Sequence, residues 1–192
     1  IAPIPIRAQS KTGSSKTFVL VHGAWHGGWC WARVASRLRA AGHRVYTPTL
    51  SGLGERSHLA LASITLDTHG QDIANVILWE ELHDVVLVGH SYGGIVVSKA
   101  IERIGANVTQ LIYLDAVVLK DGESWSSYHT PEQRAQRAAW TAQHRGGWPV
   151  PKAAGFGVVD PADQAWVDRR LTPHPGGPYT GTVRLTDRWR VL

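Results

Sequence analysis

Short apolar runs alternate with amphipathic segments over the first 116 residues of the chain. The runs are rich in β-branched and aliphatic residues and have the length of strands buried on both faces. They cover residues 17–21, 43–47, 84–88 and 110–114. The amphipathic segments cover residues 31–41, 66–82 and 95–104. Because each parallel connection requires a crossover of about this length, the pattern predicts an α/β fold with a doubly wound, mostly parallel sheet and helices on both faces.

Two of the predicted helices have an apolar face that the spacing defines. In segment 31–41 it consists of Val34, Ala35, Leu38 and Ala41. In segment 66–82 it consists of Ile73, Val76, Ile77, Trp79 and Leu82. We expect both faces to pack against the sheet.

The pattern changes after residue 116. Helices are predicted at 131–143 and 161–171, separated by stretches rich in Gly and Pro, and no strand of comparable clarity follows. We interpret this part as a small helical cap over the sheet. The predicted organisation is an irregular arm at 1–16, a core at 17–116, a cap insertion at 117–185 and the start of a returning core segment at 186–192.

Composition and charge limit the possible functions. The chain has 192 residues, 43% of them hydrophobic and 18% charged, which is typical of one globular domain. There is no apolar run of 18 residues, so no membrane span is predicted. The formal net charge is +5, but Lys and Arg are scattered singly along the chain. Since nucleic-acid binding requires basic charge gathered on one face, we expect no nucleic-acid partner.

Cysteine and methionine bear on the origin of the chain. Cys30 is the single cysteine, which excludes an intrachain disulfide and a cysteine-based zinc site. Methionine is absent even at position 1, so we expect the sequence to start after a native start codon. Residues 1–10 are an apolar, Pro-rich run with a small residue, Ala8; this fits either the end of a cleaved secretory signal or a trimmed arm. The compartment, cytoplasm or export, is left open.

The strongest chemical signal is Gly89-His90-Ser91-Tyr92-Gly93, between the strand at 84–88 and the helix at 95–104. A Gly-x-Ser-x-Gly motif between a strand and a helix is typical of a nucleophile elbow. The turn is so tight that the serine is strained and its neighbours two positions away must lack side chains. We therefore predict Ser91 as a nucleophile; the alternative is a serine in an ordinary strand-to-helix turn.

A nucleophilic serine that transfers acyl groups also needs donors for the developing oxyanion. In this architecture one donor is the backbone N–H after the nucleophile, here that of Tyr92. The second donor comes from the loop after an earlier strand, and His22-Gly23-Ala24 follows the run at 17–21. We predict the N–H of Ala24, because Gly23 allows the main chain to turn inward. The alternative is that His-Gly only ends the strand.

Three segments resemble one known family. Phe18–Trp31, Leu53–Leu59 and Val86–Gly94 are similar to the α/β-hydrolase family that contains plant methyl esterases and hydroxynitrile lyases, with bacterial esterases most similar. The likeness covers about residues 17–120 and is weaker in the cap, where Arg170–Pro175 resembles the bacterial members.

The resemblance implies a Ser–acid–His triad whose acid and histidine follow the last two strands. The chain departs from this pattern, because it ends near the point where the next core strand is expected. We therefore expect the C-terminal strands, the catalytic histidine and the acid to lie beyond residue 192, so that the triad is incomplete here. The ten histidines present are interpreted as surface or packing residues. Asp115, after the strand at 110–114, is a possible acid, with capping of a turn as the alternative.

The predicted enzyme is a serine esterase that forms an acyl-enzyme on a small ester with an apolar part, without metal or organic cofactor. Aromatic residues Trp25, Trp125 and Trp148 are candidates for the substrate pocket, with internal packing of the cap as the alternative. Rival functions are a hydroxynitrile lyase, a cofactor-free oxygenase on the same fold and a non-catalytic ligand-binding relative. The bacterial relatives favour a bacterial source, and the oligomeric state is not predicted.

Overall fold

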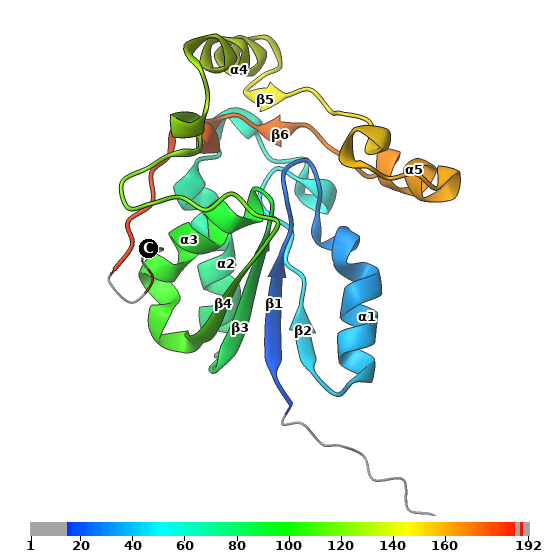
Figure 1. Ribbon diagram of the computed structural model, residues 1–192, viewed down its shortest axis with the longest axis vertical. Helices are drawn as coiled ribbons and strands as arrows, with labels where there is room; N and C mark the ends of the chain where they lie inside the picture. The colour runs from blue at the N-terminus through cyan, green and yellow to red at the C-terminus, as the bar shows by residue number, and fades with distance from the viewer. Residues whose placement is uncertain (1–14, 187–188, 190–192) are drawn as a thin grey trace, which may run out of the picture.

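The computed structural model of the chain describes residues 15–186 and 189. Its centre is a four-stranded parallel sheet with the order β2-β1-β3-β4 (Figure 1). The strands are β1 (Thr17–Val21), β2 (Arg44–Tyr46), β3 (Val85–His90) and β4 (Val108–Leu114). The three helices between them are α1 (Ala32–Ala40), α2 (Leu66–Trp79) and α3 (Gly93–Ile104). This is the alternation that the apolar pattern predicted.

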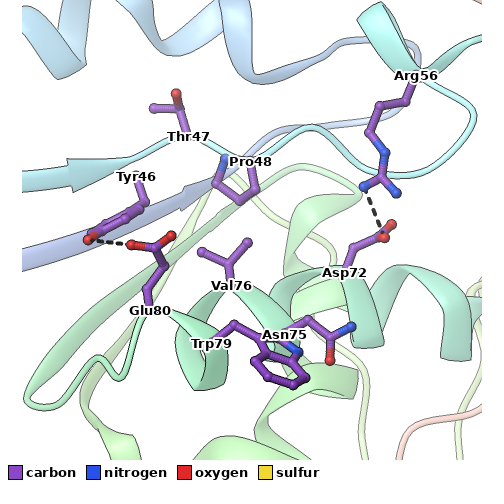
Figure 2. A pocket seen from close by; sticks show the side chains of 9 residues that line it. All are labelled: Tyr46, Thr47, Pro48, Arg56, Asp72, Asn75, Val76, Trp79 and Glu80. Carbon is purple, nitrogen blue, oxygen red and sulfur yellow. Dashed lines mark hydrogen bonds and ion pairs between the residues drawn. The ribbon is translucent and has the colours of Figure 1, made fainter.

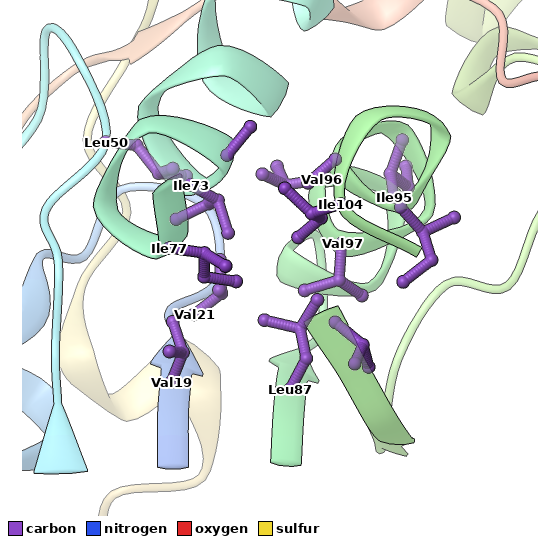
Figure 3. Packing of buried hydrophobic residues seen from close by; sticks show 14 of the residues in the cluster. Val19, Val21, Leu50, Ile73, Ile77, Leu87, Ile95, Val96, Val97 and Ile104 are labelled. Carbon is purple, nitrogen blue, oxygen red and sulfur yellow. The ribbon is translucent and has the colours of Figure 1, made fainter. Parts of the chain in front are cut away.

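The two faces of the sheet bury alternate residues of the same strands. Val19 and Leu87 point towards α2 and α3, where they pack with Ile73, Ile77 and Val97 in the larger core (Figure 3). Leu20 and Val88 point the other way and pack with Trp31 and Ala35 at the start of α1. Side chains on successive strand residues alternate between faces, so helices on both sides of the sheet explain why the runs are apolar throughout.

The parallel register places two strand ends side by side. Val21, the last residue of β1, pairs with Gly89 of β3, and Gly89 pairs in turn with Tyr113 of β4. Because the strands are parallel, the chain leaves all three at the same edge of the sheet. The loop after β1 and the turn after β3 therefore start as neighbours.

The predicted apolar faces of two helices are wrong at three positions: Trp79 in the segment 66–82, and Val34 and Ala41 in the segment 31–41. Trp79 is 83% exposed, because it is the last residue of α2 and borders a surface cavity instead of the sheet. Val34 is 42% exposed, and only Ala35 of α1 is fully buried. Ala35 packs in a cluster with Leu20 of β1, Val45 of β2, and Val86 and Val88 of β3.

The chain after residue 116 leaves the sheet and lies over the carboxyl ends of the strands as far as about residue 180, and then returns beside α3 (Figure 1). It contains helices α4 (Pro131–Gln143) and α5 (Pro161–Asp168) and two short strands, β5 (Gly147–Trp148) and β6 (His174–Pro175). The antiparallel β5–β6 pair was not predicted, and α5 is three residues shorter than the helix predicted at 161–171.

Short 3-10 turns complete the structure. They are η1 (Gly28–Trp31), η2 (Gly54–Arg56), η3 (Leu61–Ser63), η4 (Gly105–Asn107), η5 (Trp125–Tyr128), η6 (Ala153–Phe156) and η7 (Gly177–Thr180). The proposed domain boundaries stay predictions, and most of the predicted arm (1–16) and returning segment (186–192) lies outside the described residues. Among the described helices, none has the length and apolar character needed to cross a membrane.

Candidate active site

Ser91 lies in the tight turn between β3 and α3. Its φ is +53°, in the left-handed region that L-residues adopt rarely and at a cost. A Cβ on Gly89 would lie 2.6 Å from the carbonyl oxygen of Gly93, and a Cβ on Gly93 would lie 2.7 Å from that of Val21. Both contacts are with backbone that cannot give way, so this turn requires glycine on both sides of the serine.

The loop after β1 comes up against this turn. A Cβ on Gly23 would lie 3.1 Å from the Cβ of Ser91, so the absence of a side chain allows the close approach. Ala24 and Tyr92 are both buried. Within the described residues, no hydrogen-bond acceptor engages the backbone N–H of either one. These are the two N–H groups that the sequence predicted as oxyanion donors.

Hydrogen bonds from two histidines stabilise the loop after β1. The Nδ1–H of His22 donates to the carbonyl oxygen of Gly23 at 2.8 Å, while its Nε2 accepts from the N–H of Leu50 at 3.1 Å. The Nδ1–H of His26 donates to the carbonyl oxygen of Ala24 at 2.8 Å. Burial lowers the pKa of His22 to about 3, so it stays neutral and keeps this arrangement.

Tyr92 is fixed through a buried histidine of α2. Its hydroxyl donates to Nδ1 of His69 at 2.7 Å, and the Nε2–H of His69 donates to the carbonyl oxygen of Ser51 at 2.9 Å. The N–H and hydroxyl of Ser51 both donate to the carboxylate of Asp72, which also pairs with Arg56 at 3.0 Å. Burial lowers the pKa of His69 to about 4, so the imidazole remains an acceptor for Tyr92. The residue after Ser91 is thus tied to α2 and to the loop after β2.

No described histidine forms a hydrogen bond with Ser91. The ring of His90 faces Trp31 at 6.1 Å, on the α1 side of the sheet. Burial lowers the pKa of His90, an effect that the charge of Asp115 opposes. Asp115 is exposed, has a φ of +43° and forms no hydrogen bond or ion pair with an imidazole among the described residues. Its role as an acid stays a prediction.

The three tryptophans proposed for the pocket gather around His174 of β6. The ring centroids of Trp125 and Trp148 are 5.4 Å apart, and those of Trp25 and Trp148 are 6.3 Å apart. His174 packs edge-on against Tyr92 at 4.6 Å. Trp148 is fully buried, and its Nε1–H donates to the hydroxyl of Thr141, so part of this cluster is internal packing of the cap. The cluster nevertheless borders the elbow through Tyr92.

His174 has an unusual environment. It is completely buried, and neither ring nitrogen has a hydrogen-bond partner among the described residues. Burial lowers its pKa well below the usual value, so the ring is neutral. The sequence left open whether His174 is a surface or a packing residue; in the structure it is buried, without the polar partners that a buried histidine normally has.

The larger cavities are separate from Ser91. One, of about 530 Å³, lies between the end of β2 and α2 and is bordered by Pro48, Trp79 and the Arg56–Asp72 pair (Figure 2). A smaller one, of about 250 Å³, is lined by His26, His90 and Leu114 and is next to the elbow. Among the described residues there is no group of three or more His, Cys, Asp or Glu side chains arranged to hold a metal ion.

Known proteins are similar to this chain in sequence and in fold. The model of the alpha/beta hydrolase family matches residues 18–192. The chain belongs to the α/β-hydrolase family. The hydrolase is 45% identical over 172 residues to a carbendazim hydrolyzing esterase of Nocardioides sp. strain SG-4G, covering 84% of this chain and 70% of that protein. It is 41% identical over 103 residues to methylesterase 10 of Arabidopsis thaliana, covering 52% of this chain and 36% of the relative.

Solved structures show the same fold. An extracellular α/β-hydrolase from a Paenibacillus species superposes on the hydrolase with a TM-score of 0.77 at 24% identity, covering 89% of this chain and 72% of that one. A methylesterase from Arabidopsis superposes with a TM-score of 0.67, covering 90% and 72% of the two chains. The hydrolase thus spans about seven tenths of these structures and less than half of the plant methylesterase matched in sequence.

These matches confirm the predicted family, fold and enzyme class, a carboxylic ester hydrolase. The roles of Ser91, Ala24, Tyr92, Asp115 and the tryptophans stay predictions. Sequence reasoning did not find the hydrogen bond between His69 and Tyr92 or the burial of His174 against the elbow. No local motif marks either contact, because each joins segments more than 20 residues apart.

Proposed function

We propose that the hydrolase cleaves small carboxylic esters with Ser91 as nucleophile. The observation that supports this most directly is the strained Ser91 beside two backbone N–H groups, those of Ala24 and Tyr92, that no described acceptor engages. The Oγ of Ser91 attacks the ester carbonyl, and the two N–H groups hold the oxygen that becomes negative. The alcohol leaves, and water then releases the acid from the acyl-enzyme.

The nucleophile also requires a base. A serine hydroxyl stays protonated near neutral pH unless an adjacent group accepts its proton. No imidazole of the described residues is hydrogen bonded to Ser91, so the assignment of a histidine base and of an acid stays a prediction.

The proposed ester has an apolar part. The aromatic cluster of Trp25, Trp125 and Trp148 lies against Tyr92, directly after the nucleophile, and apolar walls with few polar groups are typical of small-molecule sites. The bacterial relative that is 45% identical is named for the hydrolysis of carbendazim, and the plant relatives are named as esterases and methylesterases. We propose an ester of this general kind and no metal or organic cofactor.

The test is pre-steady-state kinetics with a p-nitrophenyl ester. We expect a burst of p-nitrophenol equal to the enzyme concentration, which Ser91→Ala abolishes. Ser36→Ala changes an exposed serine of α1 and should leave the burst intact. Ester turnover that survives in Ser91→Ala would contradict the assignment of the nucleophile. Cleavage of a cyanohydrin without ester turnover would favour the lyase instead.

A further inference from the structure

A further cavity lies in the cap, between α4 and η7. Its volume is about 540 Å³, and its walls include Ala138 and Ala142 of α4, Gly177, the ring of Tyr179 and two arginines, Arg134 and Arg137. None of the residues lining this cavity, which we call the cap cleft, is acidic. It is therefore an apolar hollow whose charged groups are both cations.

Arg137 carries its charge without a carboxylate. Its guanidinium lies over the rings of Trp148 at 4.6 Å, Tyr179 at 5.4 Å and Trp125 at 5.5 Å, and it donates to Nε2 of His129 at 3.2 Å. No carboxylate of the described residues is within ion-pair distance of it. Burial lowers the pKa of Arg137, an effect that the neighbouring hydroxyl of Tyr179 opposes through its charge and its close contact with the guanidinium. The aromatic faces hold the cation in place but do not neutralise it.

Arg134, one helical turn before Arg137, lies at the rim of the cap cleft and also has no carboxylate partner among the described residues. Its Nε–H donates to the carbonyl oxygen of His129 at 3.0 Å. Its remaining N–H groups are on an exposed side chain. Two guanidinium groups on one side of an apolar cleft are the arrangement that recognises an anion.

Tyr179 provides an independent observation. The residue is 6% exposed and lines the cap cleft, and its buried hydroxyl, which lies near the guanidinium of Arg137, has no hydrogen-bond acceptor within the described chain. A buried hydroxyl without a partner costs free energy, so such a group calls for an acceptor that is supplied from elsewhere. A ligand oxygen in the cleft, beside Arg137, would meet this need.

We propose that the cap cleft binds a small organic carboxylate with an apolar body. The carboxylate would pair with Arg137 and accept from the hydroxyl of Tyr179, with Arg134 adding charge at the rim. The apolar body would lie against the methyl groups of Ala138 and Ala142. A mainly apolar wall favours a singly charged organic anion over phosphate, which needs many more polar contacts.

This site differs from the proposed catalytic site but adjoins it. Trp125, which lies under Arg137, has its ring 5.3 Å from that of Tyr92, so one aromatic layer separates the cleft from the elbow. Ester hydrolysis releases a carboxylic acid, so the ligand class is that of the reaction product. The binding site rests on Arg137 and its neighbours, and it can be tested whether or not Ser91 is a nucleophile.

The test is a titration of the protein with benzoate. Binding is measured by calorimetry and by tryptophan fluorescence, since three tryptophans surround Arg137. Benzamide, which has the same shape without the charge, and acetate, which lacks the apolar body, should each bind at least tenfold more weakly. Arg137→Gln should weaken benzoate binding at least tenfold and Arg134→Gln about threefold. Arg169→Gln, an exposed arginine of the cap outside the cleft, should not change it.

A further variant covers the case in which Arg137→Gln does not fold. Ala138 is an exposed position of α4, so Ala138→Trp fills the cleft without disturbing a buried contact, and it should abolish binding. Equal affinity for benzoate and benzamide, absence of benzoate binding, or unchanged affinity in Ala138→Trp would each overturn the proposal. Ser91→Ala should abolish ester hydrolysis and retain benzoate binding. This result would show that the binding site in the cap cleft does not depend on the proposed nucleophile.

Discussion

Gly93 occupies a position at which the backbone of β1 leaves no room for a side chain. A Cβ there would lie 2.7 Å from the carbonyl oxygen of Val21 and 2.8 Å from that of His22. We predict that Gly93→Ala lowers the free energy of unfolding by about 1–3 kcal/mol, because α3 must shift away from the strand ends. Urea denaturation measures the change.

A matched glycine serves as control. Gly155 in η6 has a negative φ, and a Cβ added there would meet no atom within 4 Å. Gly155→Ala should therefore change the free energy of unfolding by less than about 0.5 kcal/mol. Equal stability of the two variants would show that the turn can shift to accommodate a methyl group at position 93. The steric account of the Gly-x-Ser-x-Gly motif would then be wrong.

At this scale, the sequence predicted the residues whose role depends on their immediate neighbours. Gly89 and Gly93 could be identified because a tight turn restricts residue size locally. The contact between His69 and Tyr92 could not, because it depends on how α2 and α3 pack. The same limit applies to His174, which only the folding of the cap brings to the elbow.

Helix α2 ends in a residue that is poorly suited to its conformation. The N–H of Leu82 donates to the carbonyl oxygen of Ile77 and that of Glu81 to Leu78, which is a Schellman motif with Glu81 in the left-handed position. Glycine is favoured there, because it lacks the Cβ that makes a positive φ costly. We predict that Glu81→Gly raises the free energy of unfolding by about 0.5–1 kcal/mol, measured by thermal or urea denaturation.

Replacement by glycine inside the helix should instead lower the free energy of unfolding. Gln71 is exposed in the middle of α2, and Gln71→Gly should lower stability by about 1 kcal/mol. Destabilisation by Glu81→Gly as well would show that the Glu81 side chain stabilises the helix end in a way that outweighs its backbone strain.

The bounds of a helix were predicted accurately where its ends carry residues typical of helix ends. Helix α4 was predicted with its observed bounds, because proline is favoured in the first turn of a helix and Pro131 marks that turn. The prediction extended α2 to residue 82, since Glu81 gives no glycine signal for the Schellman end. Strands β5 and β6 were missed because two-residue strands have no periodicity, and only the folded cap pairs them.

For the whole molecule, three buried histidines make stability depend on pH. His22 has its pKa lowered to about 3 and His69 to about 4, and burial lowers that of His174 as well. They are neutral in the folded protein, while in the unfolded chain they take up protons below about pH 6.5. The free energy of unfolding should therefore be unaffected above pH 6.5 and fall below it, by about 1.4 kcal/mol per pH unit for each histidine.

Urea denaturation at pH 7.5, 6 and 5 tests this prediction. The interval between pH 6.5 and 5 lies above the usual range of carboxylates, so the histidines dominate it. His58→Gln, which removes an exposed histidine, should leave the slope unchanged. A free energy of unfolding that is constant from pH 7.5 to 5 would contradict the burial of three neutral imidazoles.

The left-handed conformation of Ser91 has a consequence for any attempt to improve this enzyme by selection. Holding a serine at a φ of +53° costs about 1 kcal/mol, which glycine at the same position would recover. A library screened only for survival of heat would therefore enrich replacements at position 91 that have lost the hydroxyl. Thermostable variants of this hydrolase should be sought with a screen that rewards turnover in the same step.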